Sequence, residues 1–509
     1  MSSTPHGSPS ATDPAPSQSN RRQFLMGAAG GAALARPVAE MAWGAKRPAN
    51  PGPDWDQLGR ILKGKLLRPG DSGYDDVIKI RNLRYAGTHP AGVALVADAQ
   101  DVATAIAWTR DNGVPMVSRS GGHSYAGYST TPGLVINLKA MTGVTVDRTN
   151  GNMNITGAAT NQDVANAGKP AGRAIPGGQC PAVGVAGFVL GGGLGFYVRE
   201  HGLGIDSLLA TEIVTADGTQ RRVTVEELPK KELFWALCGG GGGNFGINTS
   251  FKFRTFVVPK RVMTFSLRWD AEDCVRAFLL FQEILRDAPH SLGAIAHFGT
   301  VWDQPSGTAR TSLRVFGQVV EGKKAAHKLL EPLCGTLPWE TLIEEKDFWA
   351  AKDWLAGTPS APNAFTERSR FHTKPLPEAA VGTLVEALVH APIDRPNQSV
   401  ESPFFAWGGS VAKVAPHATA FVHRKDVWLQ SFNCSWASKQ AMDRLIAWQD
   451  KLYRAMGAYS SDRSYQNFTD PELEHPLQAY YGENLPRLIE VKRQFDPNNV
   501  FTFPQSIRG

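Results

Sequence analysis

A glycine-rich turn that carries a histidine stands at residues 119–125, in the sequence Arg-Ser-Gly-Gly-His-Ser-Tyr. It follows a short apolar stretch, residues 114–118, that is typical of a buried strand. Glycines let the backbone approach a ligand closely, and successive N–H groups can then surround an anion such as a phosphate. A strand and not a helix is expected after the turn, so the pattern differs from the dinucleotide-binding fingerprint. On its own, the pattern also fits an ordinary tight turn with His123 at the surface.

Cys180 is the second residue whose surroundings suggest chemistry. The chain has five widely spaced cysteines without a CxxC pair, so the sequence does not indicate a zinc site. An odd number leaves at least one sulfur without an intramolecular partner. Residues 177–195 are rich in glycine, which indicates repeated close approach of the backbone to a flat ligand. The alternative for Cys180 is a buried structural thiol.

Taken together, these motifs resemble the berberine bridge enzyme-like branch of the vanillyl-alcohol-oxidase flavoprotein superfamily. The resemblance extends over residues 92–250 and again over residues 465–507. It implies FAD that is bound through two covalent bonds, from His123 to the flavin 8α-methyl group and from Cys180 to flavin C6. Both substituents withdraw electrons and raise the flavin potential, which favours hydride transfer from an alcohol, while the protein supplies binding and orientation.

The same resemblance implies a catalytic base in the C-terminal segment. Tyr465 begins the sequence Tyr-Gln-Asn-Phe and matches the family's Tyr-x-Asn element, whose tyrosine takes the substrate hydroxyl proton. A tyrosine has an ordinary pKa near ~10, so a cation or hydrogen-bond donor must lower it. Arg424, Lys413 and Tyr128 are candidates for that role. Gln430, on an expected strand, is predicted to contact the substrate; the alternative is a residue hydrogen-bonded within its own sheet.

Further positions are assigned by the resemblance alone. Val183 occupies the place that controls access of oxygen to the flavin, and a small residue there implies an oxidase. The sequence departs from its relatives at Ala186-Gly187-Phe188, where Gly-Gly-His is common. No cluster of ligands predicts a metal site. The other expected FAD contacts are Arg119, Ser120, Gly121, Gly122, Ser124, Gly184, Val185, Gly192, Gly246, Ile247, Tyr481 and Asn484.

The order of expected strands and helices that must position these residues predicts an α+β fold. We expect a two-lobed FAD-binding domain of the vanillyl-alcohol-oxidase type over residues 46–258 and a substrate domain over residues 259–457. A C-terminal segment, residues 458–509, is expected to return to the FAD-binding domain. In the substrate domain, an antiparallel sheet is predicted to be covered by helices. The expected strands are 263–269, 294–301, 311–320 and 420–432, and the expected helices are 271–287, 323–334, 378–390 and 438–456.

The first 45 residues are predicted to be a leader and not part of the fold. A start rich in Ser and Pro precedes Arg21-Arg22-Gln23-Phe24-Leu25 and a short apolar run of small residues. This order indicates a signal peptide of the twin-arginine type, and hence export to the periplasm or the medium by that machinery. The run is too short to cross a bilayer, so stable membrane insertion is not expected. The alternative is an uncleaved amphipathic tail.

The net charge of +6 is mild for 509 residues and no long basic run occurs, so nucleic-acid binding is not indicated. We therefore expect an oxidase that transfers hydride from an alcohol of a sugar, oligosaccharide or glycosylated metabolite to flavin N5. Molecular oxygen is the expected electron acceptor. Two alternatives remain at this point: an oxidative ring-closing or tailoring enzyme of secondary metabolism, and a flavin-bearing binding protein without turnover.

Overall fold

Three larger sheets and the helices between them make up the fold. The computed structural model describes residues 52–227, 232–358 and 361–509. The predicted signal peptide, with Arg21 and Arg22, lies outside the described residues. The chain from Pro53 to Gly509 forms one compact unit, so the predicted domains are parts of a single body.

The first sheet has four strands in the order β1-β2-β4-β3, and its β2, β4 and β3 run parallel. Helix α3 connects β2 to β3. Its N-terminus is capped by the Asp98 carboxylate, which accepts from the N–H of Asp101, and it ends at Gly113, whose φ of 65° few other residues adopt. The elements are α1 (Trp55–Ile61), β1 (Lys65–Leu67), α2 (Tyr74–Val77), β2 (Gly92–Leu95), α3 (Ala99–Asn112), β3 (Met116–Arg119) and β4 (Leu134–Asn137).

A second sheet of five antiparallel strands, in the order β5-β6-β10-β8-β9, completes the first half of the chain. The glycine-rich segments lie between its strands, in the connections from β7 to β8 and from α7 to β10. The elements are β5 (Val144–Val146), β6 (Met153–Thr156), α4 (Asn161–Gly168), β7 (Arg173–Ala174), α5 (Val185–Leu190), α6 (Val198–His201), β8 (Leu208–Val214), β9 (Gln220–Thr224), α7 (Glu232–Leu237), β10 (Ile247–Phe253) and β11 (Phe256–Val257).

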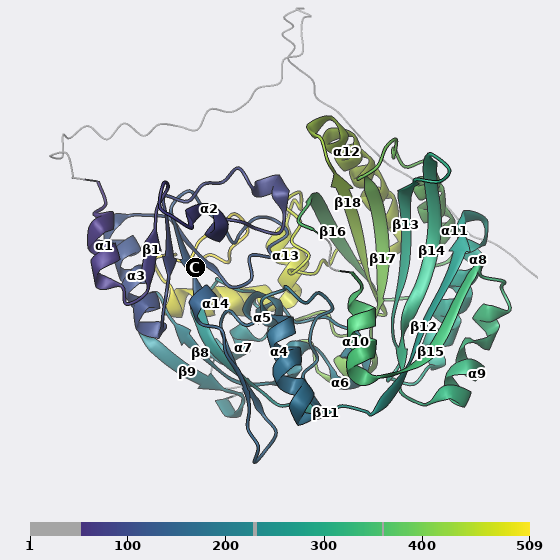
Figure 1. Ribbon diagram of the computed structural model, residues 1–509, viewed down its shortest axis with the longest axis horizontal. Coiled ribbons are helices and arrows are strands. Elements are labelled where there is room, and N and C mark those ends of the chain that lie inside the picture. The colour runs from purple at the N-terminus through teal and green to yellow at the C-terminus, as the bar shows by residue number, and fades with distance from the viewer. Residues whose placement is uncertain (1–51, 228–231, 359–360) are drawn as a thin grey trace, which may run out of the picture. The chain divides into compact units, whose positions relative to one another are not determined.

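The third sheet has seven antiparallel strands in the order β15-β12-β14-β13-β17-β18-β16. Helices α8, α9, α11 and α12 cover one of its faces (Figure 1). Helix α8 buries Cys274, Phe278 and Phe281 at helical spacing against this face. The elements are β12 (Arg261–Asp270), α8 (Ala271–Asp287), β13 (Gly293–Asp303), β14 (Thr308–Val319), α9 (Lys323–Cys334), β15 (Glu340–Asp347), α10 (Phe348–Ala356), β16 (Ala364–His372), α11 (Glu378–Val389), β17 (Ser399–Ala406), β18 (Trp428–Trp436) and α12 (Lys439–Met456).

Alternation along β18 decides which residues face the rest of the molecule. Phe432 and Cys434 belong to the core beneath the helices, whereas Leu429 packs with Tyr465 in the core of the first half. Even-numbered residues of β18 therefore point toward the helices, and odd-numbered residues point toward the other two sheets.

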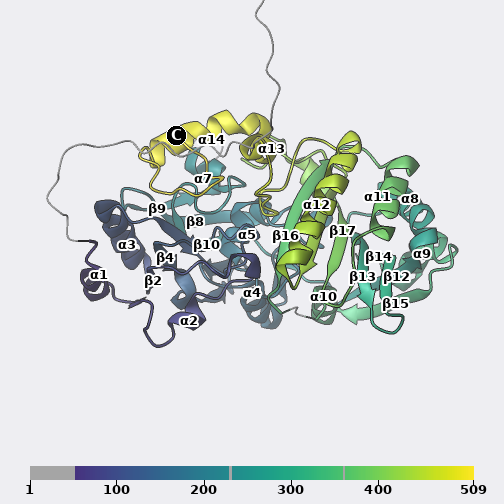
Figure 2. The same cartoon turned by 90° about the horizontal axis from the view of Figure 1, so that it is seen from above.

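The C-terminal segment returns to the first half of the chain. Helices α13 (Pro476–Tyr481) and α14 (Leu485–Phe495) follow α12, and α14 lies beside α7 (Figure 2). The Arg487 guanidinium binds the Glu232 carboxylate, with Nε 2.6 Å from Oε2. The ammonium of Lys492 is buried, and it donates to the Asp496 carboxylate at 2.7 Å and to the Asn244 carbonyl at 2.7 Å. Buried pairing of this kind fixes the segment in place.

The predicted α+β fold class is confirmed, and the expected helices 271–287 and 323–334 match α8 and α9. The expected strand 420–432 is wrong in its first half, because β18 begins at Trp428. Upstream of it, the N–H groups of Ala420 and Phe421 donate to carbonyls of Trp235 and Cys238 at the end of α7. These backbone N–H groups therefore bind carbonyls near α7 and not a neighbouring strand, and the alternation of residue types in the sequence does not reveal this.

Candidate active site

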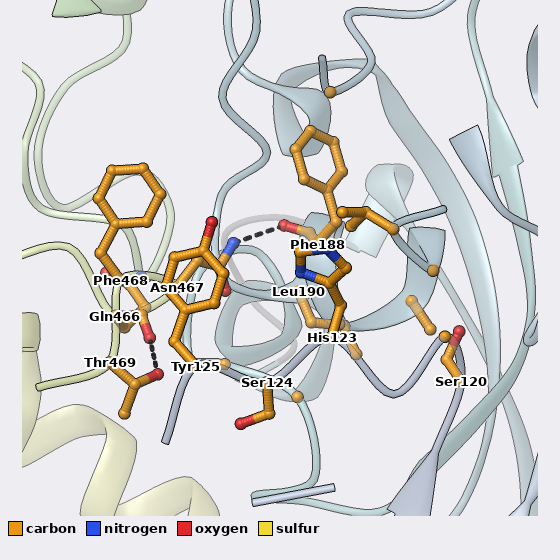
Figure 3. A pocket seen from close by; sticks show the side chains of 18 of the residues that line it. Ser120, His123, Ser124, Tyr125, Phe188, Leu190, Gln466, Asn467, Phe468 and Thr469 are labelled. Atoms are coloured by element: carbon orange, nitrogen blue, oxygen red, sulfur yellow. Dashed lines mark hydrogen bonds between the residues drawn. The ribbon is translucent and has the colours of Figure 1, made fainter. Parts of the chain in front are cut away.

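His123 stands in the loop that follows β3. The backbone turns at Gly122, where φ is 67°, and the Gly122 carbonyl accepts from the N–H of Arg81 at 3.1 Å. The side chain of Arg119 lies beneath this loop and donates to the carbonyls of Ser129, at 2.8 Å, and Val77, at 2.6 Å. The loop is thereby held from below, and His123 extends into a cavity (Figure 3).

Cys180 lies in a second loop that rests directly on the first. An added Cβ at Gly121 would come within 2.5 Å of the Gly184 nitrogen, and a Cβ at Gly184 would come within 2.3 Å of Ser120 Oγ. The Asn161 amide donates to the Cys180 carbonyl at 3.0 Å. The loops can approach this closely because both contact positions are glycines without a Cβ, and His123 and Cys180 therefore reach the same cavity.

Tyr465 reaches that cavity from the C-terminal segment. Its N–H donates to Ser369 Oγ on β16 at 2.9 Å, and its side chain is 1% exposed. The phenol oxygen accepts two hydrogen bonds, from the Gly193 N–H at 3.1 Å and from the Asn467 side-chain amide at 2.9 Å. The Asn467 amide also donates to the Phe188 carbonyl at 2.8 Å, which fixes its orientation (Figure 3).

The cavity has a volume of about 360 Å³, within the range of small-molecule sites. His123, Cys180 and Tyr465 all line it. Figure 3 shows Tyr125 beside Asn467 and Phe468, and His123 to their right, near Phe188 and Leu190. The predicted residues that also line it are Ser120, Gly121, Gly122, Ser124, Val183, Gly184, Gly246, Ile247 and Tyr481.

Burial and nearby charges set the protonation of these groups. Burial, with a contribution from the positive charge of Arg81, lowers the pKa of His123 to about 4, so the imidazole is neutral at pH 7. Cys180 is exposed at the cavity, yet the surrounding protein raises the pKa of its thiol, an effect opposed by Arg81 and Lys352. Burial raises the pKa of Tyr465 to about 12, although both hydrogen bonds to its oxygen favour the ionised form.

None of the cations and phenols expected to lower the pKa of Tyr465 does so. The Arg424 guanidinium binds the Asp206 carboxylate at 2.8 Å, and Tyr128 packs on Phe503. Lys413 lies at a separate pocket, which His123, Cys180 and Tyr465 do not line. The donors that favour the ionised phenol are instead the N–H of Gly193 and the amide of Asn467. Asn467 is the asparagine of the Tyr-x-Asn element, so its hydrogen bond to Tyr465 could have been inferred from the sequence.

Four predicted FAD contacts lie beside the cavity and do not line it. Arg119 supports the His123 loop from below, and Val185 is buried in α5, where its N–H donates to Ala159. Gly192, with φ of 132°, lets Phe421 and Tyr465 approach the backbone. The Asn484 amide donates to the carbonyls of Pro416 and Thr419.

Gln430 is not brought to the cavity, which corrects its predicted role as a substrate contact. It is fully buried on the helix-covered face of β18. Its amide oxygen is 2.9 Å from His372 Nε2, and its amide nitrogen donates to Ser402 Oγ at 2.9 Å. Gln430 is thus hydrogen-bonded within its own sheet, as in the alternative stated in the sequence analysis. The opposite face of β18, which points toward the other two sheets, carries Ser431 and Asn433, because strand residues alternate between the two faces.

Buried polar atoms test whether the cavity fits a polar cofactor. Ser120 Oγ, Asn248 Oδ1 and Gln466 Oε1 are buried, line the cavity and lack a hydrogen-bond partner among the described residues. Such atoms cost free energy unless a ligand or water binds them. Apolar walls from Leu190 and Phe503 lie nearby. Polar groups distributed along a largely apolar cavity fit FAD, which has a flat ring system and a charged pyrophosphate.

Sequence reasoning missed several residues that line the cavity. The ring of Tyr125 stacks on Phe468 at 5.7 Å between centroids, and Phe405 lies 5.6 Å from Phe468. Tyr125 and Phe468 stood inside the quoted motifs but received no role, whereas no sequence signal marked Phe405. In the part of the chain that the structure describes, no group of His, Cys, Asp or Glu could hold a metal ion. Nor is any helix of the described residues long and apolar enough to cross a membrane.

Comparison with known proteins gives the class that this fold and cavity define. Residues 90–224 match the family model of an FAD binding domain, and residues 464–508 match the model "Berberine and berberine like". The chain is 32% identical over 452 residues to the FAD-linked oxidoreductase YgaK of Bacillus subtilis (strain 168), covering 88% of this chain and 97% of that protein. This protein therefore belongs to the berberine bridge enzyme-like family of FAD-linked oxidoreductases.

Two further relatives have named activities. Tetrahydroberberine oxidase of Berberis wilsoniae is 27% identical, over 86% of this chain and 89% of that protein. The solved structure of glucooligosaccharide oxidase from Acremonium strictum, described with a 6-S-cysteinyl, 8α-N1-histidyl FAD, is 25% identical with a TM-score of 0.77. It covers 87% of this chain and 97% of its own.

Proposed function

We propose that this protein is an oxidase whose FAD is bonded to both His123 and Cys180 and which oxidises an alcohol group of a sugar, oligosaccharide or glycosylated metabolite. One observation carries the proposal: His123, Cys180 and Tyr465 line a single cavity. The doubly linked FAD of the Acremonium strictum glucooligosaccharide oxidase supports it.

The residues that would hold FAD come from three parts of the chain. Ser120, Gly121 and Gly122 offer backbone and hydroxyl groups to the pyrophosphate. Asn248 and Gln466 have unpaired amide oxygens for polar atoms of the cofactor. His123 presents a neutral imidazole, and Cys180 presents a thiol that is open to the cavity. When bound, FAD supplies the hydride acceptor of the reaction.

Tyr465 is proposed to take the proton of the substrate hydroxyl. Its oxygen accepts from Gly193 and Asn467, so two fixed donors stabilise the phenolate, which is the form of Tyr465 that can accept the substrate proton. The stacked rings of Tyr125 and Phe468 form an adjacent wall that can orient the substrate. Positioning of this kind can supply several kcal/mol, up to roughly 7–11, of the barrier reduction.

Val183 is proposed to leave a path for molecular oxygen, because it lines the cavity between the Cys180 loop and α5 with a small side chain. Export through the twin-arginine machinery is also a proposal, based on Arg21 and Arg22. Replacing both arginines by lysine should leave the protein in the cytoplasm of a host that has this machinery, as fractionation would show.

A panel of mono- and oligosaccharides with peroxide detection tests the substrate class. We expect peroxide to form with at least one carbohydrate, in amounts equal to the product. A second candidate, oxidation of an aromatic secondary metabolite, is favoured by the ring-rich wall of Tyr125, Phe188, Phe405 and Phe468. Peroxide with aromatic amines or phenols and not with any carbohydrate would select it. If none of the donors reduces the flavin under anaerobic conditions, the result would indicate a binding protein without turnover.

A further inference from the structure

Strand β16 is the last strand of the seven-stranded sheet. One of its edges pairs with β18, and the other pairs with no further strand of this sheet among the described residues. This free edge lies toward the first half of the chain (Figure 1). A free edge presents backbone N–H and C=O groups that need partners from elsewhere. Two segments of the proposed active site are attached to it, one near each end.

Asn82 attaches the His123 loop to the first end of this edge. Its side-chain amide nitrogen donates to the Phe365 carbonyl at 3.0 Å and to the Tyr125 carbonyl at 2.7 Å. Its amide oxygen accepts from the Phe365 N–H at 3.2 Å, and the residue is fully buried. Tyr125 stands two residues after His123, and its ring lies 5.1 Å from the Phe365 ring between centroids. One side chain thus binds the backbone of both the loop and the strand.

Tyr465 is attached toward the other end of the same strand. Its N–H donates to Ser369 Oγ at 2.9 Å, and this hydroxyl lies 2.8 Å from Ser464 Oγ. Ser369 is fully buried. Two residues further along β16, the Phe371 N–H donates to the Arg463 carbonyl at 3.1 Å. The segment that carries the proposed base therefore follows the backbone of β16.

The two attachment points determine how the flavin and the base can lie relative to each other. Phe365 and Ser369 are four residues apart on β16, or roughly 13 Å at the rise of a strand. A strand within a sheet holds functional groups more precisely than a loop does. His123, the proposed site of flavin attachment, and Tyr465, the proposed base, are on two separate loops, and β16 is bonded to both of these loops.

We propose that Asn82 and Ser369 are positioning residues, which attach the His123 loop and the Tyr465 segment to β16 and thereby fix the base relative to the flavin. The inference rests on the proposed function, because it concerns the geometry of the proposed hydride transfer. Neither side chain lines the cavity, so each acts through the loop that it binds.

The test uses Asn82→Asp, Ser369→Ala and the variant that carries both changes. Asn82→Asp keeps the size and the acceptor oxygen of the side chain but removes the two hydrogen bonds that its amide nitrogen donates. Ser369→Ala removes the hydroxyl that accepts from the Tyr465 N–H. Ser402→Ala is the matched control, because Ser402 is equally buried in the same sheet but its hydroxyl binds groups of β18.

Amide hydrogen exchange, followed by the masses of peptides, measures the two attachments without a substrate. We expect residues 121–127 to exchange faster in Asn82→Asp and residues 464–468 to exchange faster in Ser369→Ala, because each change removes a buried hydrogen bond to its segment. Ser402→Ala should leave both segments as in the wild-type protein. Exchange at the wild-type rate in both segments of the variants would overturn the inference.

Anaerobic reduction of the bound flavin measures what the attachments do for the reaction. Glucose, maltose, cellobiose and lactose are mixed with each protein, and the sugar that reduces the wild-type flavin fastest is used for the comparison. A misplacement of about 1 Å can cost about 100-fold, so we expect the limiting rate to fall roughly 10- to 100-fold in each single variant. The half-saturating sugar concentration and the flavin content per chain should stay as in the wild-type protein. Ser402→Ala should keep the wild-type rate.

The double variant separates one shared role from two independent losses. The effects of residues more than about 7–10 Å apart usually combine independently, so two unrelated losses of rate would multiply. If both residues fix the same geometry, the second change has little left to disturb, and the double variant should be about as slow as the slower single variant. A multiplied loss, or near-normal limiting rates in both single variants, would overturn the inference. If no sugar reduces the wild-type flavin, the proposed function fails, and the inference fails with it.

Discussion

Gly121 and Gly184 lie backbone against backbone, so that a Cβ on either would approach the other's nitrogen to 2.5 Å or less. Each glycine belongs to a different loop, one with His123 and the other with Cys180. The contact brings two segments that are about sixty residues apart in sequence to one cavity.

Gly184→Ala should therefore damage both stability and cofactor binding. The new methyl group would lie 2.3 Å from Ser120 Oγ and 2.4 Å from the Gly121 nitrogen, and such overpacking costs about 1–3 kcal/mol. We expect a lower Tm and less flavin per chain, measured by thermal unfolding and absorbance. Gly382→Ala in α11 is the control, because nothing lies within 4 Å of its added Cβ. Equal flavin content in both variants would count against the loop contact.

Tyr465→Phe should retain flavin but lose most of its reduction by substrate. A positioned base contributes roughly 10²–10⁴-fold, so anaerobic mixing should show a loss of that order in the rate of flavin bleaching. Tyr197→Phe is a matched control, since Tyr197 is buried outside the cavity lining and stacks on Phe348 at 5.3 Å. A near-normal rate in Tyr465→Phe would rule out this role.

Asn467→Leu should shift the pH dependence of flavin reduction. The Asn467 amide favours the ionised form of Tyr465, whose pKa is raised by burial to about 12. Removing this donor raises the pKa further, so the rate at any pH below it falls and the rising limb moves to higher pH. The reductive rate measured from pH 6 to 10 checks this. An unchanged profile would mean that the amide does not act through the phenol.

Glu367→Gln and Glu401→Gln should affect stability in opposite directions. Burial raises the pKa of Glu367 in the folded protein to about 8. The protonated carboxyl therefore stabilises the fold at low pH, and this contribution is lost as the pH rises from the pKa of the unfolded chain toward 8. The His297 side chain, 3.3 Å away, helps to hold the pKa of Glu401 below its ordinary value despite burial, so its contribution is present at neutral pH and lost in acid. At pH 8, Tm should rise in Glu367→Gln and fall in Glu401→Gln. The same sign for both variants would contradict this assignment.

Val183→Leu should slow reoxidation of the flavin and leave its reduction by substrate unchanged. The larger side chain would fill the proposed oxygen path at the cavity wall. Mixing the reduced protein with aerated buffer measures reoxidation directly. If reoxidation keeps its rate while substrate reduction slows, Val183 contacts the substrate and does not control oxygen.

Sequence motifs predicted the parts of the site in which residue type and spacing are tied to backbone geometry. The two glycine loops and Tyr465, which the motifs singled out, line one cavity in the structure, and their roles stay predictions. Gln430 shows the limit. Alternation grouped it with Phe432 and Cys434, but which face of β18 meets the helices depends on packing with α8 and α12. Phe405 carried no motif, and only the tertiary fold brings it to the cavity.

The mass of the denatured protein tests the central proposal most directly. The wild-type chain should retain the mass of one FAD after denaturation. His123→Ala and Cys180→Ala should each still retain it through the remaining bond, and only the double variant should release it. A wild-type mass without FAD, or complete loss in either single variant, would contradict attachment at both residues.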